Sequence, residues 1–150
     1  MAMSTKFDGD AIRASAGNIG KIMDDMSAFE ALKPQWPNAG KFKLAVWLER
    51  VVDDRRNGIV AHAEHLKIAF AEIEEKLNAI ANDFENADGE NAEKIKNSLA
   101  ELEGLIIGEV NDFDTDTENE QHNHTTDPGA ANDAHDGDGY NDNMNDEVTT

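Results

Sequence analysis

The 150-residue chain has no cysteine and only nine aromatic residues, and its 32 acidic against 13 basic residues give a net charge of −19. These values allow one small domain and exclude disulfides and thiolate metal sites. A surface of this charge repels phosphate backbones and anionic headgroups, and no run reaches the ~18 apolar residues that span a bilayer. We therefore expect no nucleic-acid partner and no membrane insertion.

The first predicted element is an amphipathic helix over residues about 10–32. Its apolar side chains recur every three or four positions, at Ile12, Ala16, Ile19, Met23, Met26 and Phe29. Asp8 or Asp10 can cap its first turn. Pro34 ends it, because the residue before a proline is displaced from helical geometry.

An unusual turn follows, in which prolines at positions 34 and 37 flank a tryptophan. The indole of Trp36 can close the open end of a helical hairpin and bury apolar area, while Gly40 permits a tight exit into the next helix. Alternatively, Trp36 is an anchor that the hairpin tip displays to a partner protein. Both interpretations remain open at this point.

A much longer helix is predicted over residues about 42–87, where no proline occurs. Its apolar residues form a heptad-like seam, as in a coiled coil, that includes Leu48, Val52, Ile59, Leu66, Phe70, Ile73, Leu77 and Ile80. Folded back from the turn, the shorter first helix covers only residues 42–64 or so. The seam from Leu66 onward then needs another cover, which is either a partner chain or residues 90–107. Because one hairpin of this size buries little apolar surface, we expect a homodimer or a heterodimer with a related helical hairpin.

A third helix is predicted over residues about 90–107, where Ile95, Leu99, Leu102 and Ile106 again have helical spacing. Residues 109–150 hold 13 of the 32 carboxylates and almost no apolar anchors, so we expect a disordered acidic tail. The predicted organisation is therefore an all-α helical-hairpin domain over residues 1–108 and a tail over residues 109–150. Deleting the tail is expected to leave the melting profile nearly unchanged.

The order of these parts resembles the WXG family of small secreted helical hairpins, which are substrates of type VII (ESX) secretion. The matching pieces are DAIRASAGNIGKIMDDM for the first helix, WPNAG for the turn and IANDFENADGENAEKI around the end of the second helix. In the last piece, Phe84 and Asp88 occupy the tyrosine and acid positions of the family's Tyr-x-x-x-Asp/Glu secretion element. The chain departs from the family in the three residues between Trp36 and Gly40, where the family has one, and in the missing tyrosine hydroxyl.

This resemblance implies a protein that is exported in folded form and is recognised by the secretion machinery through Phe84 and Asp88. The residues also allow a purely structural interpretation, in which Phe84 is the last core residue of the seam and Asp88 is an N-cap for the third helix. In that case the protein is a cytoplasmic coiled-coil adaptor with a solubilising tail.

Signals for metals and catalysis are weak. His62 and His65 share a helix face, but no further zinc ligand has a fixed spacing, so we interpret His62 as a helix contact and His65 as solvated. The run from Asp112 resembles the first half of a calcium loop, but it lacks the turn glycine and the last ligand, which leaves at most loose calcium association through the tail. We expect no cofactor, no metal site and no enzymatic activity.

The leading hypothesis is a non-catalytic protein, secreted without an ordinary signal peptide, that binds a partner chain and the secretion machinery. The N-terminal stretch lacks the apolar core of such a signal. The alternative is the cytoplasmic adaptor, and a third hypothesis is a weak binder of divalent cations or cationic partners through the tail.

Overall fold

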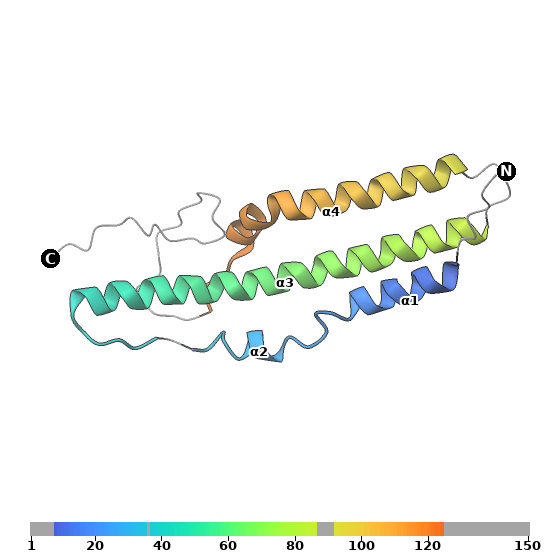
Figure 1. Ribbon diagram of the computed structural model, residues 1–150. Helices are drawn as coiled ribbons and strands as arrows, with labels where there is room; N and C mark the ends of the chain where they lie inside the picture. The colour runs from blue at the N-terminus through green and yellow to red at the C-terminus, as the bar shows by residue number, and fades with distance from the viewer. Residues whose placement is uncertain (1–7, 36, 87–91, 125–150) are drawn as a thin grey trace. The chain divides into compact units, whose positions relative to one another are not determined.

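The computed structural model describes residues 8–35, 37–86 and 92–124. Within these ranges the chain forms helices and no strands, which confirms the predicted all-α fold class. The helices are α1 (Gly9–Gly20), α2 (Ser27–Glu30), α3 (Lys43–Glu85) and α4 (Ala92–Glu120) (Figure 1). The long predicted helix over residues 42–87 corresponds to α3 within two residues at each end.

The first predicted helix is split in two. α1 begins as expected, because the Asp8 carboxylate accepts a hydrogen bond from the Ala11 backbone N–H at 3.1 Å. It ends at Gly20, and α2 is a separate helix. Before α2, the Asp25 carboxylate accepts a bond from the Ser27 N–H at 3.0 Å, a local contact that competes with helical hydrogen bonding. Hydrogen bonds from Ser27 also lower the pKa of Asp25.

α4 extends to Glu120, well beyond the predicted end near residue 107. Its last turns are acidic, and carboxylates near a helix C-terminus oppose the helix dipole. Packing offsets this, because the Phe113 ring lies against the rings of His62 and His65, with centroids 4.8 and 5.3 Å away. Thr117 is fully buried, and its hydroxyl donates to the Phe113 carbonyl at 2.7 Å. The rest of the predicted tail, residues 125–150, lies outside the described residues.

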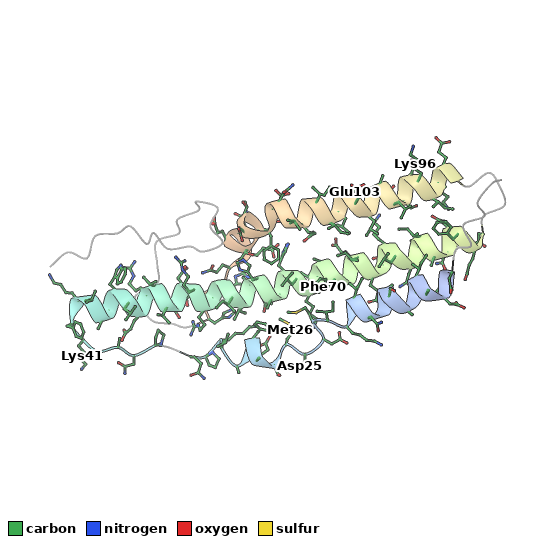
Figure 2. All side chains as sticks on the ribbon, viewed as in Figure 1. Asp25, Met26, Lys41, Phe70, Lys96 and Glu103 are labelled. Carbon is green, nitrogen blue, oxygen red and sulfur yellow. The ribbon has the colours of Figure 1, made fainter. Side chains whose placement is uncertain are left out.

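The chain divides into two compact units, of which the first comprises Met1–Asp24 and Lys67–Val110. In this unit α1 and α4 both lie alongside α3, which runs between them (Figure 1). The buried apolar residues are mostly small, namely Ala16, Ala69, Ile80 and Ala81. A side chain at Gly20 would collide with the Glu74 carboxylate, so the end of α1 lies close to α3. Lys96 and Glu103 project from the side of α4 that faces away from α3 (Figure 2).

The second unit comprises Asp25–Leu66 and Asn111–Thr150. Its buried apolar residues are Ala45, Val60, Ala61 and Ala63. Lys33 ties α2 to α3, because its ammonium lies 2.8 Å from the carboxylates of both Glu30 and Glu64. Hydrogen bonds to Glu30 and then to Glu64 raise the pKa of Lys33 above its ordinary value.

Polar side chains are also buried in this second unit. Asp53 pairs with Arg56, whose guanidinium donates to the Asn57 side-chain oxygen at 3.0 Å. Gln121, just after α4, donates to the Asp54 carboxylate at 2.8 Å. Buried charge is stable only when it is paired. The Asp53–Arg56 pair meets this need within α3, whereas the bond from Gln121 joins the segment after α4 to α3.

Candidate functional site

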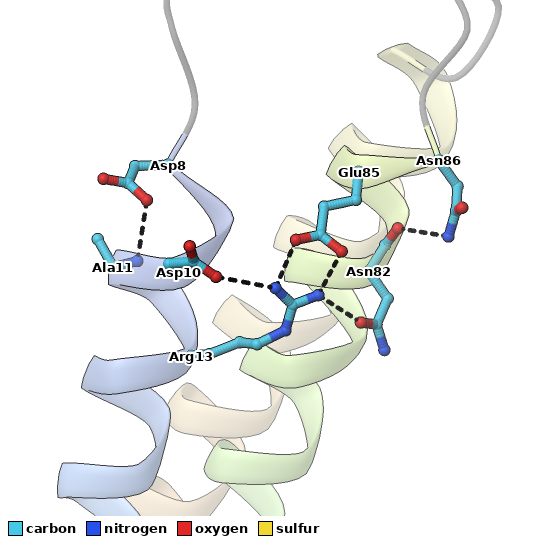
Figure 3. A network of polar contacts seen from close by, with 7 residues as sticks. All are labelled: Asp8, Asp10, Ala11, Arg13, Asn82, Glu85 and Asn86. Atoms are coloured by element: carbon cyan, nitrogen blue, oxygen red, sulfur yellow. Dashed lines mark hydrogen bonds and ion pairs between the residues drawn. The ribbon is translucent and has the colours of Figure 1, made fainter.

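The last turn of α3, which contains Phe84, is bound to α1 by an arginine. The Arg13 guanidinium donates to both oxygens of Glu85, at 2.5 and 2.6 Å, and to the side-chain oxygen of Asn82 at 2.8 Å (Figure 3). Asp10, on the same turn of α1, lies 3.6 Å from the guanidinium. Such a bidentate salt bridge fixes the orientation of the two side chains as well as the distance between them. Both side chains are partly exposed, so water screens their attraction.

The same turn of α3 is bound to α4 through the residue before Phe84. The Asp83 carboxylate accepts a hydrogen bond from the Lys94 ammonium at 2.5 Å and from the Ser98 hydroxyl at 3.2 Å. Phe84 therefore lies between two residues that are held by different helices. Its own side chain is half-buried.

The carboxyl groups of Asp83 and Glu85 have lowered pKa values because each accepts a hydrogen bond from a basic side chain. The hydrogen bond from Lys94 lowers the pKa of Asp83 below its ordinary 3.8, and the hydrogen bond from Arg13 lowers the pKa of Glu85 below its ordinary 4.5. A carboxyl whose pKa falls on folding stabilises the fold fully above its unfolded pKa. That contribution is lost as the pH falls through the folded pKa.

We therefore expect the attachment of α1 to weaken as the pH falls below 4.5, the ordinary pKa of the Glu85 carboxyl. Hydrogen exchange of the α1 amides should be slow at pH 7 and should approach the rate of the free helix in acid, after correction for intrinsic exchange. In Glu85→Gln, which keeps the size of the side chain but not its charge, exchange should be faster at pH 7 and should depend less on pH. Equal pH dependence in both proteins would contradict this role of Glu85.

At the other end of α3, the loop before the helix is held by a buried carboxylate. Glu49 accepts hydrogen bonds from the backbone N–H groups of Ala39 at 2.6 Å and Gly40 at 3.3 Å. Gly40 has a φ of +119°, a conformation that side chains disfavour, which confirms the sequence-based reason for a glycine there. Two of the predicted recognition residues, Trp36 and Asp88, lie outside the described residues.

Beside this loop the second unit contains an open groove. The groove has a volume of about 480 Å³ and is lined by Leu32, Gln35, Pro37, Val52, Arg55, Arg56 and Ile59. Four of these seven residues are apolar, two carry guanidinium groups and none is acidic. Such a surface suits an apolar side chain that arrives with a carboxylate beside it. We refer to it below as the groove.

The predicted seam is exposed in the half that we expected to be covered. Near the groove, Leu48, Val52 and Ile59 are 45%, 44% and 43% exposed. Farther along α3, Ile80 is buried and the other seam residues are half-buried, namely Leu66, Phe70, Ile73 and Leu77. The expectation that one continuous first helix covers residues 42–64 was wrong, because the segment of the second unit that contacts this part of α3 is helical only over Ser27–Glu30 and leaves the seam residues near the groove exposed.

Comparison with known proteins adds no relative. No family model, no curated protein and no solved structure matches this chain. In the part of the chain that the structure describes, no helix is both long enough and apolar enough to cross a membrane.

His62 and His65 lie at the contact between α3 and the end of α4. His62 lies 3.3 Å from the Asp114 carboxylate, as expected of a residue at a helix contact. His65 was predicted to be solvated, but its side chain is only 11% exposed and lies near Asp116 and Glu120. Among the described residues, no group of three or more His, Asp or Glu side chains is arranged to hold a metal ion. The calcium-like run from Asp112 to Glu120 is helical, so it does not form the loop that calcium coordination needs.

Sequence reasoning missed the residues that hold α3 in place. Arg13 lies 72 residues from Glu85 in the chain, and Lys94 lies 11 residues from Asp83 on a different helix, so only the fold reveals these pairings. Phe113 did carry a signal, since it is the one aromatic residue in the acidic segment 109–124. Arg55, a basic residue that interrupts the apolar spacing of α3, lies 3.1 Å from Asp54 of its own helix.

Proposed function

We propose that this protein is a non-catalytic helical binding protein that is exported by type VII secretion. It binds a related helical hairpin through the exposed apolar face of α3 beside the groove. The supporting observation is the exposure of Leu48, Val52 and Ile59, which share one helix face and flank a largely apolar groove. Contiguous exposed apolar surface of this kind is typical of protein-interaction sites.

Export is proposed from the resemblance to the WXG family and from the position of Phe84. Contacts from α1 and α4 hold the residues on either side of Phe84, so a receptor meets this helix end in one conformation. Preorganised surfaces bind more tightly, because less conformational entropy is lost on binding. An aromatic residue followed by an acid suits a receptor pocket with a basic rim.

The proposal contains no catalytic step. Some polar clusters are pairs of opposite charge that join helices, as in Arg13 with Glu85 and Lys94 with Asp83, and another, Asp53 with Arg56 and Asn57, is buried within α3. Catalysis needs a nucleophile or base placed beside a space for substrate. The groove offers arginine and glutamine side chains, which suit binding.

The proposal is tested by export from a host with type VII machinery. We expect the intact chain in the culture filtrate and a Phe84→Ala/Asp88→Ala variant in the cells, with equal helicity by circular dichroism. Phe84→Tyr, which restores the family's hydroxyl, should be exported at least as well as the natural chain. Phe42→Ala is a matched control, because Phe42 is 64% exposed near the start of α3 and should not affect export.

One outcome would reverse the proposal. If the intact chain stays in the cells while the host's own substrate is exported normally, Phe84 is a structural residue. The protein is then better described as a cytoplasmic coiled-coil adaptor.

A further inference from the structure

The segment around the groove has a charge opposite to that of the whole chain. Between Leu32 and Ile59 there are six basic and three acidic residues, a net charge of +3 in a chain of −19. The three acids, Glu49, Asp53 and Asp54, are all buried. Asp53 and its partner Arg56 are both buried and their charges cancel, so the net charge of +3 comes from the other five basic residues against Glu49 and Asp54.

The buried acids are engaged within the protein. Glu49 holds the loop before α3, Asp53 pairs with Arg56, and Asp54 bonds with Arg55 and Gln121. In contrast, Lys41 and Lys43 are exposed, and the Arg55 side chain is 24% exposed at the groove. Lys43 is separated from Arg55 by about 18 Å along α3, which exceeds a Debye length, so the basic groups at the groove itself are Arg55 and Arg56, which line it.

We infer that the groove is a docking site for an amphipathic helix of a partner protein that carries carboxylates beside its apolar face. Leu32, Pro37, Val52 and Ile59 would contact the apolar side chains of that helix. Arg55 would bind a carboxylate at its edge, because a guanidinium has five N–H donors and can bond more than one carboxylate at once. This inference rests on the proposed binding function and specifies the chemistry of the partner.

A protein helix suits the groove better than a lipid surface does. The site is a concave space of about 480 Å³, which takes individual side chains, whereas a bilayer presents a broad and nearly flat surface. The remaining residues of the chain carry a charge of −22, which an anionic bilayer repels. A separate acidic helix avoids most of this repulsion because it covers only the groove.

The test uses the full chain and three synthetic 18-residue helical peptides, with binding measured by fluorescence anisotropy. The first peptide has a leucine face flanked by glutamates, the second has lysines in place of the glutamates, and the third has serines in place of the leucines. We expect the first to bind at least tenfold more tightly than either of the others. Its affinity should fall as salt rises, since the charged part of the contact is near the surface.

Variants locate the binding on the protein. Arg55→Gln should weaken binding of the first peptide about tenfold, which corresponds to about 1.4 kcal/mol, and Arg55→Lys should recover part of the loss. Val52→Ser should weaken it as well. Ile68→Ser and Lys96→Gln are matched controls at exposed positions of the other unit and should change nothing. Circular dichroism of each variant shows whether it is folded.

Three outcomes would overturn the inference. Equal binding of the glutamate and lysine peptides would show that the partner need not be acidic, while the export result would still stand. Tighter binding to phosphatidylglycerol vesicles than to the first peptide, lost in Arg55→Gln, would make the occupant a membrane surface. A dimer in sedimentation equilibrium that forms at lower concentration than the peptide complex, and that Val52→Ser disrupts, would make it a second copy of this chain.

Discussion

Replacing Ile80 by alanine is expected to lower the free energy of unfolding by about 2–5 kcal/mol. Ile80 is only 2% exposed, and among the described residues of the first unit it is the one large apolar side chain that is buried. The other buried apolar residues of this unit are Ala16, Ala69 and Ala81, which offer little side-chain volume with which to fill a cavity. The loss should therefore lie well above the transfer free energy of the deleted atoms alone.

The matched control lies on the same helix. Ile68→Ala removes the same atoms from a side chain that is 55% exposed, and it should cost less than about 1 kcal/mol. Urea denaturation followed by circular dichroism measures both changes. Similar losses for the two variants would show that Ile80 is not the centre of this core.

The long helix was predictable because its signal is long and uniform. Over residues 42–87 the apolar spacing of three and four has no competing proline, and α3 follows it closely. The first helix was less predictable, since the apolar pattern continues through Met23 and Met26 while the backbone does not. A local hydrogen bond from Ser27 to Asp25 outweighs the pattern there.

The apolar periodicity did not predict which helices pack against each other. The groove was therefore not predicted either. Periodicity identifies the apolar face of α3 but not which part of it a short helix covers. The contacts that decide this are Arg13 with Glu85 and the close approach of Gly20 to Glu74. The exposed part of the seam in the second unit comprises Leu48, Val52 and Ile59, beside a groove that no sequence motif indicated.

Deleting residues 109–150 is expected to destabilise the protein, contrary to the expectation from composition. The deletion removes the end of α4, including Phe113 on His62 and His65 and the buried Thr117. Phe113→Ala isolates the apolar part of this contact and should cost about 1–3 kcal/mol, because the ring is half-buried. Phe42→Ala, at a ring that is 64% exposed, should cost much less.

Hydrogen exchange of the α3 amides between residues 54 and 66 shows where the stability is lost. In the natural chain these amides are covered by the end of α4, since Gln121 bonds to Asp54 and His62 lies beside Asp114. The deletion and Phe113→Ala should both accelerate their exchange, whereas residues 76–85 should change little. If the melting profile were unchanged after the deletion, the contact of Phe113 would not offset the repulsion among the carboxylates of α4. The acidic segment would then be solvated, as its composition indicates.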